Sequence, residues 1–272
     1  MLDKYLLSVR EQTPLIHNIT NYVTINDCAN ILLASGASPI MADDQKEVEE
    51  ITSICNGLNI NIGTLNENTS AAMIAAGKKA NELNIPVELD PVGVGASDFR
   101  KKFIKELMSE VKFSVIKGNT SEITIMAAGV GQTRGVDAVT DEEDNIEQLM
   151  EYSQQFSQKT GAIIVMSGAT DIVSNANSSA IIKNGVATMS KITGTGCMLS
   201  ALLTGFIAAN KDEQFEAVTS AVCMMGLAGQ KAEEIRNNNN AGTASFRNYL
   251  IDEISKMTPD ELEKGAKYEI KK

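Results

Sequence analysis

The sequence contains no tryptophan, one histidine and few aromatic residues. Of its 272 residues, 4% are aromatic and 43% hydrophobic, so the core must consist mainly of aliphatic side chains and some of the 12 methionines. The four cysteines form no Cys-x-x-Cys pair, and with a single histidine they make a structural zinc site an unfavourable interpretation. This cysteine usage favours a reduced protein of the cytoplasm.

Positive charge and long apolar runs are also scarce. The formal net charge is -11, which argues against nucleic acid as a partner, because binding to phosphate backbones depends on clustered Lys and Arg. No signal-peptide pattern begins the chain, and no apolar run is long enough and free enough of charge to cross a bilayer. We therefore expect no membrane partner, and a phosphate-containing substrate would need local donors to overcome the overall charge.

Short apolar segments alternate with amphipathic ones over most of the chain. Five segments are expected to be strands, namely 38–41, 57–63, 85–91, 113–119 and 161–168. Three are expected to be helices, namely 64–84, 98–111 and 141–158. This alternation predicts an α/β fold with a mostly parallel central sheet and helices on both faces. No internal boundary is evident, so a single domain over residues 1–272 is expected.

The pattern changes after the fifth expected strand. Residues 171–189 predict two or three short antiparallel strands joined by turns. A long, nearly all-apolar helical block is expected from about 196 to 231, buried in the core or in an oligomer interface. The asparagine run at 237–240 predicts a turn before a last amphipathic helix at 244–257.

In an open parallel sheet, ligands bind beyond the carboxyl ends of the strands. That rule selects the loop 193–197 and the strand-end residues Met41, Asp90, Lys117, Asn119, Glu122 and Ser167. The loop belongs to the segment "ITGTGCMLS", where two glycines precede an apolar helix. Unpaired N–H groups and the helix dipole attract an anion at such a position.

Two carboxylates that follow neighbouring strands, Asp90 and Glu122, would face this glycine loop. They make a plausible place for Mg²⁺ with a nucleotide, because Mg²⁺ is usually held by one or two carboxylates, water and substrate phosphates. A structural interpretation stays open for both. Asp90 could cap the turn that follows it, and Asn119 could be a helix N-cap with Glu122 closing a capping box.

Cys197 stands at the start of the expected helix, where the helix N-terminus stabilises a thiolate. The other cysteines are interpreted as inert: Cys28 and Cys223 lie in apolar helical segments typical of a core, and Cys55 is grouped with them. The lone His17 is interpreted as a structural histidine with satisfied hydrogen bonds.

Four segments together resemble a known family. They are "PLIHNITNYVTINDCANILLASGASPIMA", "LDPVGVGAS", "IKGNTSEI" and "TGTGCMLSA". They are similar to the hydroxyethylthiazole kinases of thiamine salvage, in the ribokinase-like superfamily, from about residue 8 to the final helix. The resemblance implies a ribokinase-like domain that uses ATP and Mg²⁺ to phosphorylate the hydroxyl of 4-methyl-5-(2-hydroxyethyl)thiazole. It also implies a homotrimer with the thiazole site at the subunit boundary.

The resemblance assigns expected roles to the substrate side of the site. Met41 and Gly194 match positions that contact the thiazole. The N–H groups of the loop, from Gly194, Thr195 and Gly196, match an anion hole. The superfamily's loop reads Gly-x-Gly-Asp with the Asp as base, and this chain has Cys197 at that position.

On the nucleotide side, Lys117 stands where the family usually has Arg on the phosphates, and Ser167 where it usually has Thr. Lys keeps the charge but loses the planar fork of Arg. Asp90 and Glu122 match the acidic positions near the metal. Residues 240–246, "NAGTASF", replace a Gly-Pro-Gly-Ser-Phe run, which loosens the turn beside the nucleotide pocket.

Phosphoryl transfer passes through a loose transition state, so positioning and charge neutralisation supply most of the catalysis. A thiol at the base position is then tolerable. We hypothesise that Cys197 assists proton transfer and is not a covalent nucleophile. Two alternatives stay open: an ATP- or ADP-dependent dehydratase that repairs hydrated nicotinamide cofactors, which would be expected to keep Asp in the loop, and a nucleotide-binding sensor without turnover.

Overall fold

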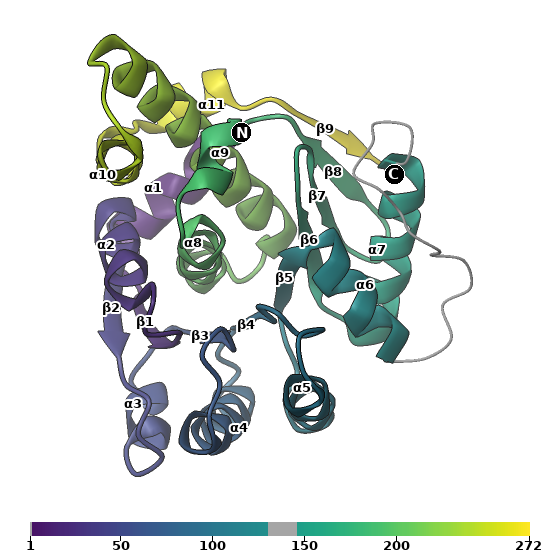
Figure 1. The fold of residues 1–272 in the computed structure, drawn as a ribbon. Coiled ribbons are helices and arrows are strands. Elements are labelled where there is room, and N and C mark those ends of the chain that lie inside the picture. Colours follow the sequence, from purple (N-terminus) through teal and green to yellow (C-terminus); the bar gives the residue numbers. More distant parts are fainter. Residues whose placement is uncertain (1, 130–145) are drawn as a thin grey trace.

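In the computed structural model, which describes residues 2–129 and 146–272, the described strands form one nine-stranded sheet (Figure 1). Their order across the sheet is β2-β1-β3-β4-β5-β6-β7-β8-β9. The bounds are β1 Leu15–Ile19, β2 Ser38–Met41, β3 Gly57–Asn61, β4 Val87–Asp90, β5 Val115–Asn119, β6 Ile163–Ser167, β7 Asp171–Ser174, β8 Ser179–Ile182 and β9 Tyr268–Lys271. Strands β1 to β6 pair in parallel and β6 to β9 antiparallel, which confirms the mostly parallel sheet.

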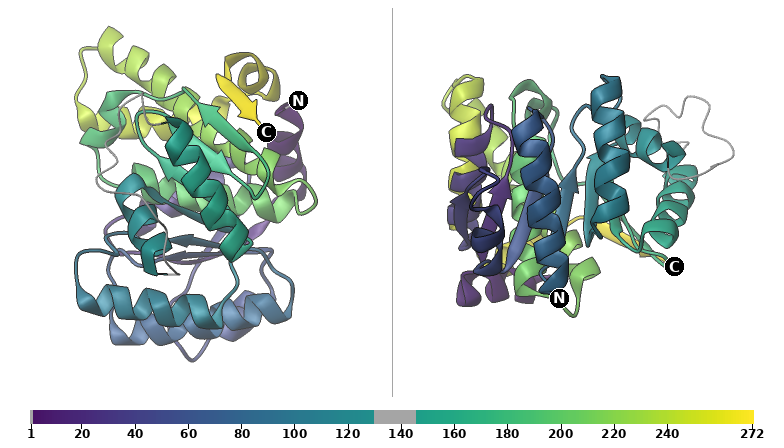
Figure 2. Two further views of the ribbon diagram at one scale, coloured as in Figure 1. Left: turned by 90° about the vertical axis from the view of Figure 1, so that its right-hand side faces the viewer. Right: turned by 90° about the horizontal axis from the view of Figure 1, so that it is seen from below.

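Helices cover both faces of the sheet (Figure 2). One hydrophobic core lies among α1 Asp3–Gln12, α2 Ile25–Ser35, α8 Thr195–Ala209, α9 Gln214–Asn238, α10 Thr243–Lys256 and α11 Pro259–Gly265. The other lies among α3 Val48–Ser53, α4 Glu67–Glu82, α5 Asp98–Glu110, α6 Thr120–Gly129 and α7 Ile146–Thr160. Among these described helices, none is both long and apolar enough to cross a bilayer.

Strand β4 shows how the pleat of the sheet positions polar groups. Val87 and Leu89 point into the core beneath α4 and α5. Since side chains alternate along a strand, Glu88 and Asp90 point to the opposite face, where α8 packs against β4. Both are fully buried there, so two acidic side chains are enclosed between the sheet and α8.

The five expected strands and the helices at 64–84 and 98–111 are present as β2 to β6, α4 and α5. Side-chain caps begin both helices: Asn66 accepts the N–H of Thr69, and Ser97 accepts the N–H of Arg100. The helix expected at 141–158 is α7 from Ile146 onward, and residues 141–145 lie outside the described residues.

In the second half, two of the two or three antiparallel strands expected at 171–189 form, as β7 and β8, and Ala187–Lys191 is a 3₁₀ helix. Two other expectations there are wrong. The apolar block is two helices, because the polar run 210–213 separates α8 from α9. The helix expected to be last is followed by α11 and by β9, which pairs with β8.

Candidate active site

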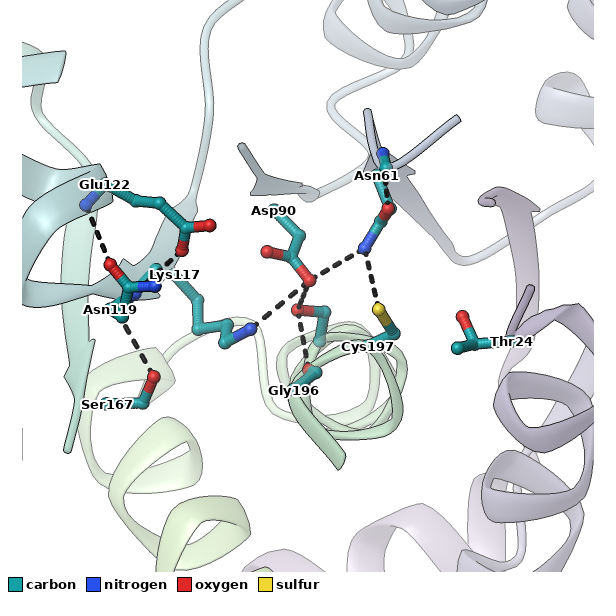
Figure 3. A network of polar contacts seen from close by, with 12 residues as sticks. Thr24, Asn61, Asp90, Lys117, Asn119, Glu122, Ser167, Gly196 and Cys197 are labelled. Atoms are coloured by element: carbon teal, nitrogen blue, oxygen red, sulfur yellow. Dashed lines mark hydrogen bonds and ion pairs between the residues drawn. The ribbon is translucent and has the colours of Figure 1, made fainter. Parts of the chain in front are cut away.

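Polar side chains from β3, β4, β5 and α8 meet at the carboxyl edge of the parallel strands (Figure 3). At their centre is Asp90, the last residue of β4 and fully buried. Its Oδ2 accepts hydrogen bonds from Asn61 Nδ2 at 2.7 Å and Ser200 Oγ at 2.9 Å, and an ion pair from Lys117 Nζ at 3.2 Å. Its Oδ1 is also buried and has no partner among the described residues. Asp90 is therefore the centre of a network and not a simple turn cap.

Lys117 is the buried cation of this network. Burial acts to lower the pKa of Lys117, but the negative charges around it, first that of Asp90, outweigh this and raise it. Its Nζ lies 3.0 Å from where a Cβ on Gly196 would stand, so the ammonium sits against the first turn of α8. A Cβ at position 196 would require the ammonium to shift by a few tenths of an ångström. Lysine and helix N-terminus thus present positive charge at one place.

The glycine loop opens α8 as the sequence predicts. Gly194 is the N-cap residue with a φ of 96°, and a Cβ there would stand 2.9 Å from Thr24 Cγ2. The first hydrogen bond of the helix runs from Met198 N–H to the carbonyl of Gly194, at 2.8 Å. The N–H groups of Thr195, Gly196 and Cys197 therefore precede the helical hydrogen bonds and point out of the helix end. This geometry suits an anion.

Cys197 is the half-buried cysteine, and its Sγ accepts bonds from Asn21 Nδ2 at 3.2 Å and Asn61 Nδ2 at 3.4 Å. The other three cysteines are buried. Burial raises the pKa of Cys28 and Cys223 to about 12 and that of Cys55 to about 11, so all three are inert thiols at neutral pH. The interpretation of these three as inert is confirmed.

Glu122 ties the loop after β4 to the start of α6. Its Oε1 accepts the N–H of Gly93 and its Oε2 the N–H of Asn119, both at 2.9 Å. Asn119 Oδ1 in turn accepts the N–H of Glu122 at 2.9 Å. The capping box is therefore present, and each carboxylate oxygen of Glu122 is engaged by a backbone donor.

Of the two expected carboxylates, only Asp90 has an oxygen without a donor among the described residues, because both oxygens of Glu122 accept backbone N–H groups. No three His, Cys, Asp or Glu side chains of the described ranges 2–129 and 146–272 are grouped to hold a metal. Asp90 Oδ1 is nevertheless a buried carboxylate oxygen without a donor, which fits a cation or its bound water. This donor set suits Mg²⁺ held mainly by phosphate oxygens and water, since Mg²⁺ gives up its water reluctantly.

Two other expected residues lie at strand ends farther from Asp90. Ser167 ends β6, and its Oγ donates to the carbonyl of Gly118 at 3.4 Å. It is half-buried and stands opposite Asn119 in the register. Met41 ends β2 at the edge of the sheet, and β1 and β3 separate it from β4. Lys117 thus contacts Asp90 directly, Ser167 lies at the end of the next strand but one from β4, and Met41 lies at the edge of the sheet.

Sequence reasoning missed four side chains of this region. Asn61 ends β3 and obeys the strand-end rule, which could have found it. Asn21 follows β1, a strand not predicted, and Ser200 lies one helical turn after Gly196. Arg100 donates to the carbonyls of Ile62, Gly63 and Val92 and braces the loops after β3 and β4.

His17 is structural, as the sequence interpretation holds. It is fully buried, with Nδ1 2.9 Å from Thr52 Oγ1 and Nε2 2.8 Å from the carbonyl of Ala42. Burial lowers the pKa of His17, so the ring stays neutral at physiological pH.

Glu88 is a second buried acid, two residues before Asp90 on the same strand face. Burial raises the pKa of Glu88 well above its usual range, and the negative charge of Asp90 raises it further against the effect of Lys117. Neither carboxyl oxygen has a hydrogen-bond partner among the described groups. Asn59, its cross-strand neighbour on β3, also has an Oδ1 without a partner among the described groups.

We predict that Glu88→Gln removes part of the pH dependence of stability. The pKa of Glu88 in the folded chain is raised above its usual 4.5. Its contribution to the free energy of unfolding is therefore complete below pH 4.5 and is lost as the pH rises toward the folded-state pKa. In that window the free energy of unfolding falls by up to ~1.4 kcal/mol per pH unit. Urea unfolding of both chains at pH 5 and 8 measures this. Equal pH dependence in the two chains would refute it.

Comparison with known proteins agrees with this geometry. The model of the hydroxyethylthiazole kinase family matches residues 6–260. The chain is 56% identical over 272 residues to hydroxyethylthiazole kinase of Clostridium acetobutylicum, covering 99% of each. A solved structure of hydroxyethylthiazole kinase protein from Pyrococcus horikoshii matches with a TM-score of 0.88 and 34% identity, covering 100% of this chain and 99% of that one.

The fold itself is shared more widely. A ribokinase-like superfamily protein of Enterococcus faecalis matches with a TM-score of 0.61 at 13% identity, covering 95% of this chain and 94% of that one, a likeness of fold alone. The expected ribokinase-like architecture is thereby confirmed. With the family match over most of its length and the close relative over all of it, the chain belongs to the hydroxyethylthiazole kinase family.

Proposed function

We propose that this chain transfers the γ-phosphoryl group of ATP to the hydroxyl of 4-methyl-5-(2-hydroxyethyl)thiazole, with Mg²⁺. The observation that carries the proposal is the meeting of a buried ammonium, the open N–H groups of α8 and a buried carboxylate at one sheet edge. Lys117, the N-terminal turn of α8 and Asp90 supply these three. Family membership gives the substrate, and this geometry suits phosphoryl transfer.

Each residue has a proposed part in binding. The N–H groups of Gly194, Thr195 and Gly196 form the anion hole for the transferred group. Lys117 and Ser167 contact the nucleotide, and Lys117 can do so because Asp90 engages one of its three ammonium donors. Asp90 would hold Mg²⁺ or its water through Oδ1, with Glu122 fixing the adjoining loop. When bound, Mg²⁺ neutralises charge on the phosphates.

The proposed transfer is direct and forms no covalent intermediate on the protein. The substrate hydroxyl oxygen attacks the γ-phosphorus, and the bond from that phosphorus to the oxygen retained by ADP breaks. The hydroxyl proton passes to the Sγ of Cys197, whose thiolate becomes a thiol. Since the transition state is loose, the proton leaves late, and a thiolate is a sufficient acceptor.

The thiazole site is proposed to be shared between copies of the chain. Met41 and Gly194 would contact the thiazole: Met41 ends the edge strand β2, and Gly194 lies against Thr24, which follows the neighbouring strand β1. Apolar side chains of the segment that follows β1 and of α2, namely Tyr22, Val23 and Leu33, are 77%, 57% and 59% exposed, which supports a covering partner. We infer a homotrimer, and we place it in the cytoplasm because all four cysteines are free.

Light scattering tests the assembly directly. We predict three times the 29.2 kDa mass of the chain, and Leu33→Glu should lower that mass by placing a charge in the buried face. The matched control is Ile54→Glu. Ile54 is another exposed apolar residue and is the C-cap residue of α3. The mass of a single chain at micromolar concentration would argue against the trimer.

Two other functions receive less support. A dehydratase for hydrated nicotinamide cofactors would be expected to keep Asp where this chain has Cys197. A sensor without turnover would not need Asp90, Lys117 and the open turn of α8 gathered at one edge. A single domain over residues 1–272 fits all three functions and is supported by the sheet to which both ends of the chain contribute strands.

Release of ADP from MgATP, measured with and without hydroxyethylthiazole, tests the proposal. We predict thiazole-dependent ADP formation and a phosphorylated thiazole by mass spectrometry. Nucleotide binding without thiazole-dependent turnover would favour the dehydratase or the sensor.

The same assay tests the part of Cys197. Cys197→Ala should lower kcat by about 10²-fold, at the low end of the range for general-base catalysis. Cys197→Asp should keep or improve kcat, because its carboxylate can accept the same two amide N–H groups. Full kcat in Cys197→Ala would show that Cys197 takes no part in proton transfer.

A further inference from the structure

Two buried amides contact the sulfur of Cys197, and Figure 3 shows one of these contacts, that of Asn61. Asn21 lies just after β1, and Asn61 ends β3. Their Nδ2 atoms stand 3.2 Å and 3.4 Å from Sγ, within hydrogen-bond range of sulfur. Both amides are almost fully buried, with 4% and 1% exposure, so their contacts with the sulfur face little competition from solvent.

The orientation of both amides is fixed by donors on their oxygens. Asn21 Oδ1 accepts the N–H and the hydroxyl of Thr24, at 3.1 and 3.0 Å. Asn61 Oδ1 accepts the N–H of Gly63 at 2.9 Å and Asn21 Nδ2 at 3.0 Å. A backbone N–H cannot reverse its role, so the oxygens face these donors and the NH₂ groups face the sulfur.

Each amide hydrogen of Asn21 and Asn61 has an acceptor. Asn21 Nδ2 donates one to Asn61 Oδ1 and the other to Cys197 Sγ. Asn61 Nδ2 donates one to Asp90 Oδ2 at 2.7 Å and the other to the same sulfur. An amide nitrogen accepts no hydrogen bond, so the sulfur is an acceptor toward both, and any proton that it carries must point elsewhere.

We propose that Asn21 and Asn61 are positioning residues that hold the sulfur of Cys197 as a proton acceptor for the substrate hydroxyl. The two N–H donors occupy two acceptor directions of the sulfur, and they set the direction of its remaining lone pair. Asn61 also joins that sulfur to Asp90, so the proton acceptor and the carboxylate keep a fixed separation. This role rests on the proposed kinase function, and both asparagines act through Cys197.

Asn21→Asp is the sharpest test, because it keeps the shape and the acceptor for Thr24 while replacing the NH₂ that faces the sulfur. The matched control is Asn18→Asp: Asn18 is an equally buried amide on β1 that bonds to Ile16 and Asn59 and not to Cys197. Asn21→Leu and Asn18→Leu form a second pair without added charge, for use if the first pair does not fold.

Two readouts separate positioning from loss of stability. The first is the rate at which iodoacetamide alkylates Cys197 at pH 7 without substrates, followed by peptide mass, since the thiolate is the reacting form. The second is kcat and KM in the ADP assay. We expect both the alkylation rate and kcat to fall about tenfold in the Asn21 variant, with KM for ATP changed less than about threefold. The Asn18 variant should stay within about twofold in both.

Alkylation and kcat that change equally in the Asn21 and Asn18 variants would overturn the positioning role. The alkylation readout needs no turnover, so it is independent of the kinase function. If the wild-type chain shows no thiazole-dependent turnover, the proposed function fails and the catalytic part of the inference fails with it. Slowed alkylation would then still support the contact between Asn21 and the sulfur.

Discussion

The ion pair between Asp90 and Lys117 is the interaction on which the site depends. A buried carboxylate is tolerated only when it is paired and hydrogen-bonded, and Asp90 Oδ2 receives donors from β3, β5 and α8. Each donor therefore fixes its own element relative to β4. Removing any one of them leaves part of a buried charge without compensation. The requirement to satisfy one carboxylate thus sets the shape of the whole sheet edge.

The same pair explains how an acidic protein can receive a polyphosphate. The chain has a net charge of -11, so the field of the whole molecule repels anions. At the site, Lys117 lies against Gly196, where the open N–H groups of α8 add the positive end of a helix dipole. Glycine at 196 leaves room for this close approach. Water and salt screen the repulsion from distant surface carboxylates. The donors at the site act at short range, where screening is weaker.

The sequence alone could predict strand ends, but not side-chain contacts between elements. Asp90, Lys117 and Glu122 were predictable because each lies near the carboxyl end of an apolar strand that is easily recognised. Asn21 was not, because polar residues obscure β1, which places it near Asn61. The contact of Ser200 with Asp90 depends on the rotation of α8 against the sheet, which no local pattern encodes. Strand β9 is short and mostly exposed, so its pairing with β8 left no signal in its own residues.

The most direct test of this interpretation is the thiazole-dependent kcat of Asp90→Asn, measured alongside circular dichroism and cooperative unfolding. The amide keeps the shape of the side chain but loses the charge that pairs with Lys117 and that we propose holds Mg²⁺ or its water. We predict a folded protein of lower stability whose kcat is reduced by at least about 10²-fold, the scale of losing a preorganised electrostatic contact. A folded Asp90→Asn chain with kcat within about twofold of the wild type would contradict a site centred on this carboxylate.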